Sequence, residues 1–187
     1  MKYRNSIYSI FYILVVAYVS SALAQIQRNE VNPEEKIREL GLNLENIETP
    51  VANYVSIIQT GNLLYISGHA ALIPGKSGEE VKGIVPTEVN VDKAYEAARF
   101  AAINILASLK NEVKDLRRIK KIIQLIGMVH ATSDFDQHSR VINGASDLFV
   151  EVFGPKVGKH TRAAVGMASL PMGATVEITM IVELKSQ

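Results

Sequence analysis

The end of the chain alternates between apolar and other residues with the period of a β-strand. Every second residue from 176 to 184 is apolar, namely Val176, Ile178, Met180, Val182 and Leu184. Successive side chains of a strand point to opposite faces, so this pattern predicts a strand with one face in the core. Leu-Pro-Met-Gly at 170–173 predicts a turn before it, because proline fixes φ and glycine tolerates positive φ.

Further elements follow from apolar periodicity and from cap and turn signals. We expect strands at 53–59, 63–67 and 122–131, a strand before the turn at 170, helices at 33–41, 90–109 and 133–154, and a loop at 74–86. Asn90 or Asp92 is the expected cap of the second helix, and Ser133 or Asp134 that of the third. The order β-β-α-β-α-β-β predicts an α+β fold with two helices packed on one face of the sheet.

The two longer helices each carry an apolar stripe that can face the sheet. The stripes consist of Ala94, Ala98, Ala101, Ala102, Ile105 and Leu109, and of Val141, Ile142, Ala145, Leu148, Phe149 and Val152. The strands, however, are apolar on both faces, as Tyr65 and Ile66 illustrate. A sheet covered on one side must hide its second apolar face, so we expect an oligomer.

The first 24 residues have the pattern of a secretory signal peptide. Lys2 and Arg4 precede an almost wholly apolar run at 7–19, and Ala-Leu-Ala at 22–24 fits a cleavage site. The run is short of the about 20 residues that a membrane span needs. We expect cleavage and a secreted, periplasmic protein that starts at Gln25, with an uncleaved anchor as the alternative; the intact mass of the native protein distinguishes them. Residues 25–46 are expected to form a polar spacer and the short helix.

Composition narrows the classes of function. Without Lys2 and Arg4 the chain carries 18 basic and 19 acidic residues, which argues against a dedicated nucleic-acid-binding protein. The chain has no cysteine, so disulfides, thiolate catalysis and cysteine-ligated metals are excluded. His130, His138 and His160 lack metal-ligand spacing, and we expect neither a metal site nor a cofactor.

Two sequence blocks resemble one known family. Arg-x-x-Val-x-x-x-x-Leu-Pro starting at Arg162, followed by Val-Glu-Ile at 176–178, is similar to the C-terminal signature of the RidA (YjgF, L-PSP) imine deaminases. The block from Asn53 to Gly68 resembles the N-terminal hairpin of the same family. The resemblance covers roughly 47–187. It implies a chorismate-mutase-like fold and a homotrimer with sites in the clefts between subunits.

The resemblance also assigns roles to five residues. Arg162 matches the substrate-binding arginine, and its planar fork suits a carboxylate; a surface ion pair is the alternative. Glu177 matches the glutamate thought to position or activate water, with a structural salt bridge to Arg162 or to another subunit as the alternative. Tyr54, Ser67 and Asn143 match residues that line the pocket, although each could be a structural residue instead.

The sequence departs from the family pattern at two positions. The deaminases commonly have cysteine where this chain has Ala164, so a thiol is unavailable in the pocket. They commonly read Ser-Gly-Gln where this chain has Ser-Gly-His, ending at His69. We expect His69 to lie on the rim of the substrate pocket, with a role as an acid or base as the alternative.

Three functions follow from these observations. The first is an exported enamine/imine deaminase that converts small 2-imino acids to 2-keto acids and ammonia, with Arg162 and Glu177 as its catalytic residues. The second is a small-carboxylate-binding protein without catalysis, because reactive imines arise mainly in the cytoplasm and an exported protein lacks an obvious supply. The third, endoribonuclease activity, is disfavoured by the near-neutral charge and by the lack of an aromatic-rich basic groove.

Overall fold

The computed structural model describes residues 31–44, 52–72 and 80–186. The chain divides into two units, 1–31 and 32–187, and all that follows concerns the second. The predicted signal peptide and part of the predicted loop at 74–86 lie outside the described residues. Within the described residues, no helix has the length and apolar content that a membrane crossing requires.

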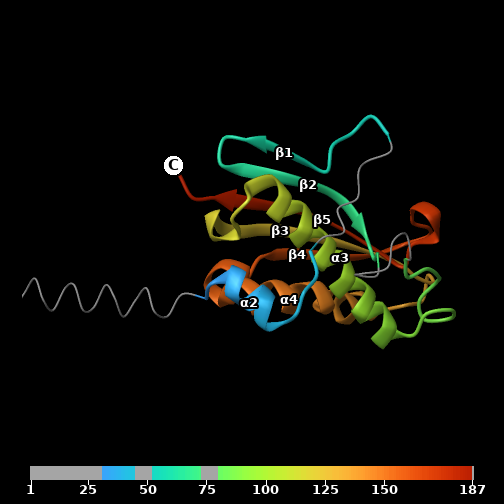
Figure 1. Ribbon diagram of the computed structural model, residues 1–187. Coiled ribbons are helices and arrows are strands. Elements are labelled where there is room, and N and C mark those ends of the chain that lie inside the picture. Colours follow the sequence, from blue (N-terminus) through green and yellow to red (C-terminus); the bar gives the residue numbers. More distant parts are fainter. Residues whose placement is uncertain (1–30, 45–51, 73–79, 187) are drawn as a thin grey trace, which may run out of the picture. The chain divides into compact units, whose positions relative to one another are not determined.

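Five strands form one mixed sheet in the order β1-β2-β5-β3-β4 (Figure 1). The strands are β1 (Ile57–Thr60), β2 (Leu63–Ala70), β3 (Ile119–His130), β4 (Thr161–Met167) and β5 (Val176–Leu184). β4 runs parallel to β3, and the other neighbours are antiparallel. The expected turn before β5 is present as the short 3-10 helix η2 (Pro171–Gly173). The strands that it joins, β4 and β5, are separated in the sheet by β3.

The helices α3 (Val91–Val113) and α4 (His138–Gly158) cover one face of this sheet, which confirms the predicted α+β fold. Every residue of the two expected apolar stripes is fully buried. Asn90 caps α3, as one of the two expected candidates, by accepting a hydrogen bond from the Lys93 N–H at 2.9 Å. Burial of these stripes supplies the main driving force for placing both helices on the sheet.

The start of α4 differs from the prediction. Ser133 and Asp134 do not cap it: the chain makes a turn in which the Phe135 N–H donates to the Thr132 carbonyl at 3.1 Å, and the helix begins only at His138. Its expected end at Gly154 is an interruption, where φ is 73°, followed by one last turn to Gly158. Positive φ at this position favours glycine.

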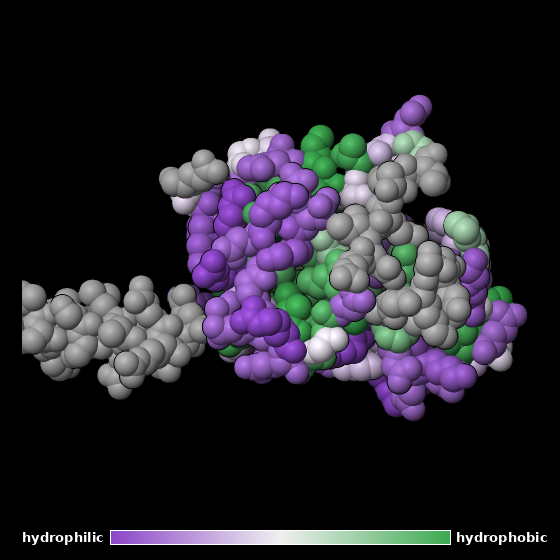
Figure 2. All heavy atoms as spheres, in the orientation of Figure 1, coloured by the Kyte–Doolittle hydropathy of each residue, from purple (hydrophilic) through white to green (hydrophobic). Residues whose placement is uncertain are grey.

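The sheet face away from the helices carries several large apolar side chains that are open to solvent. Large side chains on it include Ile58, Tyr65, Val165 and Met167, with exposed fractions of 61, 41, 40 and 37 %. Figure 2 shows hydrophobic residues at the top of the view, where β1 and β2 lie, and a second hydrophobic area in the middle of the view, with hydrophilic residues along the left and lower margins. Exposed apolar patches of this kind are typical of surfaces that bind another protein or another subunit.

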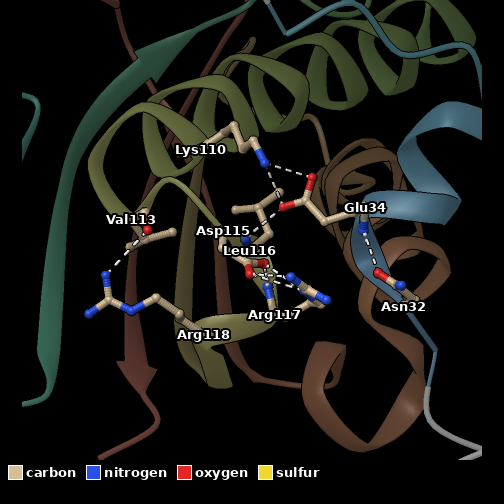
Figure 3. A network of polar contacts seen from close by, with 8 residues as sticks. All are labelled: Asn32, Glu34, Lys110, Val113, Asp115, Leu116, Arg117 and Arg118. Atoms are coloured by element: carbon tan, nitrogen blue, oxygen red, sulfur yellow. Dashed lines mark hydrogen bonds and ion pairs between the residues drawn. The ribbon is translucent and has the colours of Figure 1, made fainter. Parts of the chain in front are cut away.

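The short helix α2 (Pro33–Glu39) belongs to the same unit as the sheet, so the domain begins before the predicted residue 47. It lies against α4 and against the 3-10 helix η1 (Leu116–Arg118) and buries Ile37. Figure 3 shows what fixes it: both carboxylate oxygens of Glu34 accept from Lys110 Nζ at 2.7 Å, and Oε1 also accepts from the Leu116 N–H at 2.8 Å.

Replacing Glu34 with alanine should lower the free energy of unfolding by about 1–2 kcal/mol, because the Leu116 N–H loses its acceptor and Lys110 its partner. Urea unfolding measures the change. The matched control is Glu39→Ala on the same helix, where only an exposed ion pair with Lys36 is lost and a change below about 0.5 kcal/mol is expected. Equal effects of the two variants would show that Glu34 does not anchor α2.

Candidate functional site

Arg162 lies near the start of β4 and points to the helix-covered side of the sheet. Its pairing partner in β3 is Leu125, whose side chain is fully buried beneath the helices, and paired residues share a face. Arg162 Nη1 donates to Asn143 Oδ1 at 2.7 Å and to Ser146 Oγ at 3.1 Å, both on α4. The two acceptors are one helical turn apart, so α4 holds the guanidinium at two points.

His160 lies two residues before Arg162 in the sequence and contacts the same Ser146 hydroxyl. Its Nδ1 is 2.6 Å from the Gly158 carbonyl oxygen, and its Nε2 is 3.1 Å from Ser146 Oγ. A carbonyl oxygen can only accept, so Nδ1 carries the hydrogen and the neutral ring accepts at Nε2 from the Ser146 hydroxyl. Asn143, Ser146, His160 and Arg162 are called the arginine half-site below.

The electrostatics of the arginine half-site favour the neutral form of His160. Burial lowers the pKa of His160, and the positive charges of Arg162 and Lys121 lower the pKa further, whereas the hydrogen bond to the Gly158 carbonyl opposes them. The Phe149 ring stands edge-on to the imidazole, with 6.3 Å between ring centroids.

Sequence reasoning missed Ser146 and considered His160 only as a metal ligand. Two signals were present: Ser146 is three residues after Asn143 on one helix face, and His160 is two residues before Arg162 along the chain. Among the described residues there is no cluster of three or more histidine or acidic side chains that could hold a metal ion.

Glu177 lies on β5 and points to the open face of the sheet, where it is half-buried. Its carboxylate lies directly over Gly68, at a position that any Cβ on residue 68 would overlap. Burial raises the pKa of Glu177, and the negative charge of Glu80 raises it further. The result is a carboxylate with more basicity than an exposed glutamate has.

Ser67 and Tyr54 lie beside the same part of the sheet. The pairing of β2 with β5 shifts between Ile66 and His69, so Ser67 and Gly68 form a β-bulge. Ser67 Oγ donates to the Val55 carbonyl at 2.7 Å, which ties the segment that carries the exposed Tyr54 to the bulge. Glu177, Ser67 and Tyr54 are called the carboxylate half-site below.

The two half-sites face different sides of the sheet within one subunit. Arg162 pairs with Leu125, whose side chain is on the helix-covered face. Glu177 pairs with Met128, which lies further along β3 by an odd number of residues, namely from 125 to 128. Side chains three residues apart on a strand point to opposite faces. Within the described residues Arg162 and Glu177 form no ion pair, so the structure gives no support to a salt bridge between them in the same subunit.

His69 does not lie on a pocket rim, and the prediction that it does is wrong. Its side chain is buried on the helix-covered face, where Nδ1 is 2.8 Å from the Ser67 carbonyl oxygen and Nε2 is 2.8 Å from Ser108 Oγ on α3. Both ring nitrogens are therefore engaged inside the subunit. Ala164, at the position of the family cysteine, is on the same side of β4 as Arg162.

Comparison with known proteins agrees with the motifs. The family model described as "YjgF/chorismate mutase-like, putative endoribonuclease" matches residues 34–184. The chain belongs to this family. The match begins within α2, in agreement with the packing of that helix on the domain, and the resemblance predicted from the two sequence blocks is confirmed at the level of the family.

Relatives match the YjgF-family domain over nearly their whole length. Protein TCP17 of Trypanosoma cruzi is 37% identical over 150 residues, which cover 80% of this chain and 92% of that protein. A solved protein of unknown function from Agrobacterium tumefaciens is 43% identical, with a TM-score of 0.71 and coverage of 82% and 94%. A putative endoribonuclease from Shewanella oneidensis is 29% identical, with a TM-score of 0.76 and coverage of 82% and 99%.

Proposed function

We propose that this YjgF-family protein is an imine deaminase that hydrolyses small 2-imino acids to 2-keto acids and ammonia, at sites completed between the subunits of a homotrimer. The observation that carries the proposal is the way α4 holds Arg162. Asn143 and Ser146 both bind Nη1, and within the described residues Nη2 and Nε make no hydrogen bond or ion pair. That leaves one edge of a fixed planar fork for a carboxylate.

The chemistry requires a water molecule and a group that moves protons. Water adds to the carbon of the C=N bond while Glu177 accepts one of its protons and the imine nitrogen takes up a proton, which gives a tetrahedral intermediate with a hydroxyl and an amino group. The amino group then takes up a second proton and leaves as ammonia, while the hydroxyl loses its proton and becomes the carbonyl of the 2-keto acid. The raised pKa of Glu177 suits both transfers. A group that takes and returns a proton works best when its pKa is close to the ambient pH, and the shift is in that direction. Imines also hydrolyse without an enzyme, so a moderate acceleration suffices.

The homotrimer explains how two half-sites on opposite faces can act together. The open apolar face has to be covered, and the carboxylate half-site lies on that face, beside residues such as Tyr65 and Val165. If the β4 edge of a neighbouring subunit covers this face, then Arg162 of the neighbouring subunit approaches Glu177 of the first subunit. A single small ligand could then contact both.

The test is to measure ammonia and 2-keto acid release from imines that an amino-acid oxidase generates in situ. Arg162→Ala should lower kcat/KM by about 100-fold, because a bidentate charged contact to the substrate is lost. Arg140→Ala is the matched control: Arg140 is exposed on α4 and bonds Asp92 at 2.8 Å, and its loss should leave the rate unchanged. No acceleration by the folded wild-type protein with any imine would overturn the proposal.

A carboxylate-binding protein without catalysis is the second candidate, and the arginine half-site alone favours it. In that case the wild-type protein binds 2-keto acids, Arg162→Ala does not, and neither changes the rate of ammonia release. RNA cleavage, which the family description names, is less favoured, because a chain with 20 basic and 19 acidic residues lacks the strong basic excess of most RNA-binding proteins. Cleavage of single-stranded RNA that depends on Arg162 and Glu177 would reverse this order.

A further inference from the structure

We propose that Ser146 and His160 link carboxylate binding at Arg162 to proton uptake, so that the ligand enters the arginine half-site together with one proton on His160. The inference rests on the proposed function only for the presence of a carboxylate at Arg162. It adds two residues and a regulatory property to that site, namely tighter binding at lower pH.

The hydrogen bonds define the starting state. The Gly158 carbonyl fixes hydrogen on Nδ1 of His160, so the neutral ring accepts at Nε2 and the Ser146 hydroxyl donates to it. The same Ser146 oxygen accepts from Arg162 Nη1 at 3.1 Å. The single hydroxyl hydrogen of Ser146 is therefore directed away from the guanidinium and toward the imidazole.

Protonation of His160 reverses one of these bonds. Nε2 then carries a hydrogen and donates to Ser146 Oγ, which has two lone pairs and can accept from His160 and Arg162 together. The hydroxyl hydrogen is released and can rotate toward a ligand bound at Arg162. The protonated state thus offers an anion one additional donor and one additional positive charge within two hydrogen bonds of the guanidinium.

The surroundings of His160 explain why the proton arrives with the ligand. The charges that act on the ring are both positive: Arg162 comes from β4, and Lys121 comes from β3 with its Nζ donating to the Lys156 carbonyl at 2.8 Å. The helix α4 contributes the Ser146 hydroxyl, the Phe149 ring and the Gly158 carbonyl. A carboxylate at Arg162 offsets the nearest positive charge, so it favours the charged form of His160.

The sign of the pH dependence follows from this linkage. The free protein holds His160 with a lowered pKa, and a bound carboxylate raises that pKa toward its ordinary value. Between the two pKa values, binding takes up a proton and tightens as the pH falls. Below the lower pKa, His160 is protonated in both states and the dependence disappears.

The experiment is isothermal titration of the full-length oligomer with 2-oxobutyrate, a non-hydrolysable carboxylate probe, in buffers of different ionisation enthalpy. The wild-type protein should take up a proton on binding, and its Kd should be about tenfold smaller at the acid end of a series from about pH 5.5 to about pH 8. His160→Gln should bind without proton uptake and with a Kd independent of pH, whereas Ser146→Ala, which keeps the imidazole but loses the hydroxyl that connects it to Arg162, should take up less proton than the wild type and show a weaker pH dependence. A purely structural role of these residues would weaken binding at every pH alike.

His138→Gln is the matched control, because His138 is also on α4 but its ring lies against Gly166 and Phe135 and not against Ser146. It should keep the proton uptake of the wild type. Binding without proton uptake in the wild-type protein, or uptake that persists in His160→Gln, overturns this inference and leaves the proposed deaminase intact. Proton-linked binding without imine turnover supports the inference and overturns the deaminase, and a failure to bind the probe overturns both.

Discussion

Two inactive variants should regain activity when their subunits are mixed. If Arg162 of one subunit works with Glu177 of the next, a mixed trimer of Arg162→Ala and Glu177→Gln subunits contains sites in which both residues are intact. Random mixing in equal amounts restores about a quarter of the wild-type sites, because a site needs one particular ordered pair of neighbours. Each variant alone should be nearly inactive, so a gain of this size is easily measured above the activity of either variant.

The physical reason is the position of the two half-sites in the sheet. Leu125, the partner of Arg162, is buried under the helices, and Met128, the partner of Glu177, faces the other way. No side-chain rotation brings the two groups to the same side of the sheet. A shared site therefore requires two subunits.

The variants are co-expressed with two different affinity tags, purified over both tags and tested in the imine assay. Trimers that carry both tags are all mixed and each has one intact site, so about a third of the wild-type sites is expected in the purified sample. The control mixes Arg162→Ala with Asn143→Ala, which damage the same half-site, since Asn143 bonds Arg162 at 2.7 Å in one subunit. That mixture should show no more than the mean activity of its two components. If the first mixture also stays at its mean, the site is contained within one subunit and the shared arrangement is wrong.

The sequence allowed the local features of the fold to be predicted because they depend on burial alone. The five apolar residues of β5 are buried in the alternation that the pattern indicates, and all twelve stripe residues of α3 and α4 are fully buried. The start of α4 could not be predicted in this way. Asp134 hydrogen-bonds Thr132 in a turn, which lowers the pKa of Asp134, and that local bond competes with the capping role expected for it.

His69 shows why the site was only partly predictable. In an uninterrupted strand, residue 69 would share the open face with Tyr65, because it is an even number of positions away. The bulge at Ser67 and Gly68 adds one residue and moves His69 to the buried face, where Ser108 binds it. Likewise, the opposite directions of Arg162 and Glu177 depend on the register of β3 with both neighbours, and such long-range pairing leaves no local signal.

Replacing Gly144 with alanine should destabilise the protein by about 3 kcal/mol or more, because the helices α3 and α4 cross at this glycine without room for a side chain. A Cβ on residue 144 would overlap the Tyr95 carbonyl oxygen and lie 3.2 Å from the Arg99 backbone nitrogen. Both are backbone atoms of a helix and cannot move aside, so α4 has to shift as a whole. Such a shift carries Asn143 and Ser146 away from Arg162, and activity should fall together with stability.

The direction of the stability change in Gly144→Ala distinguishes close helix packing from helix propensity. In a helix without close neighbours, glycine to alanine stabilises by about 1 kcal/mol, so intrinsic helix propensity alone predicts an increase. Urea unfolding of Gly144→Ala against Ser139→Ala, an exposed position on the same helix with an expected change below about 0.5 kcal/mol, separates the two. A stabilised, fully active Gly144→Ala protein would mean that α3 and α4 do not approach each other this closely, and the support of Arg162 by α4 would need another explanation.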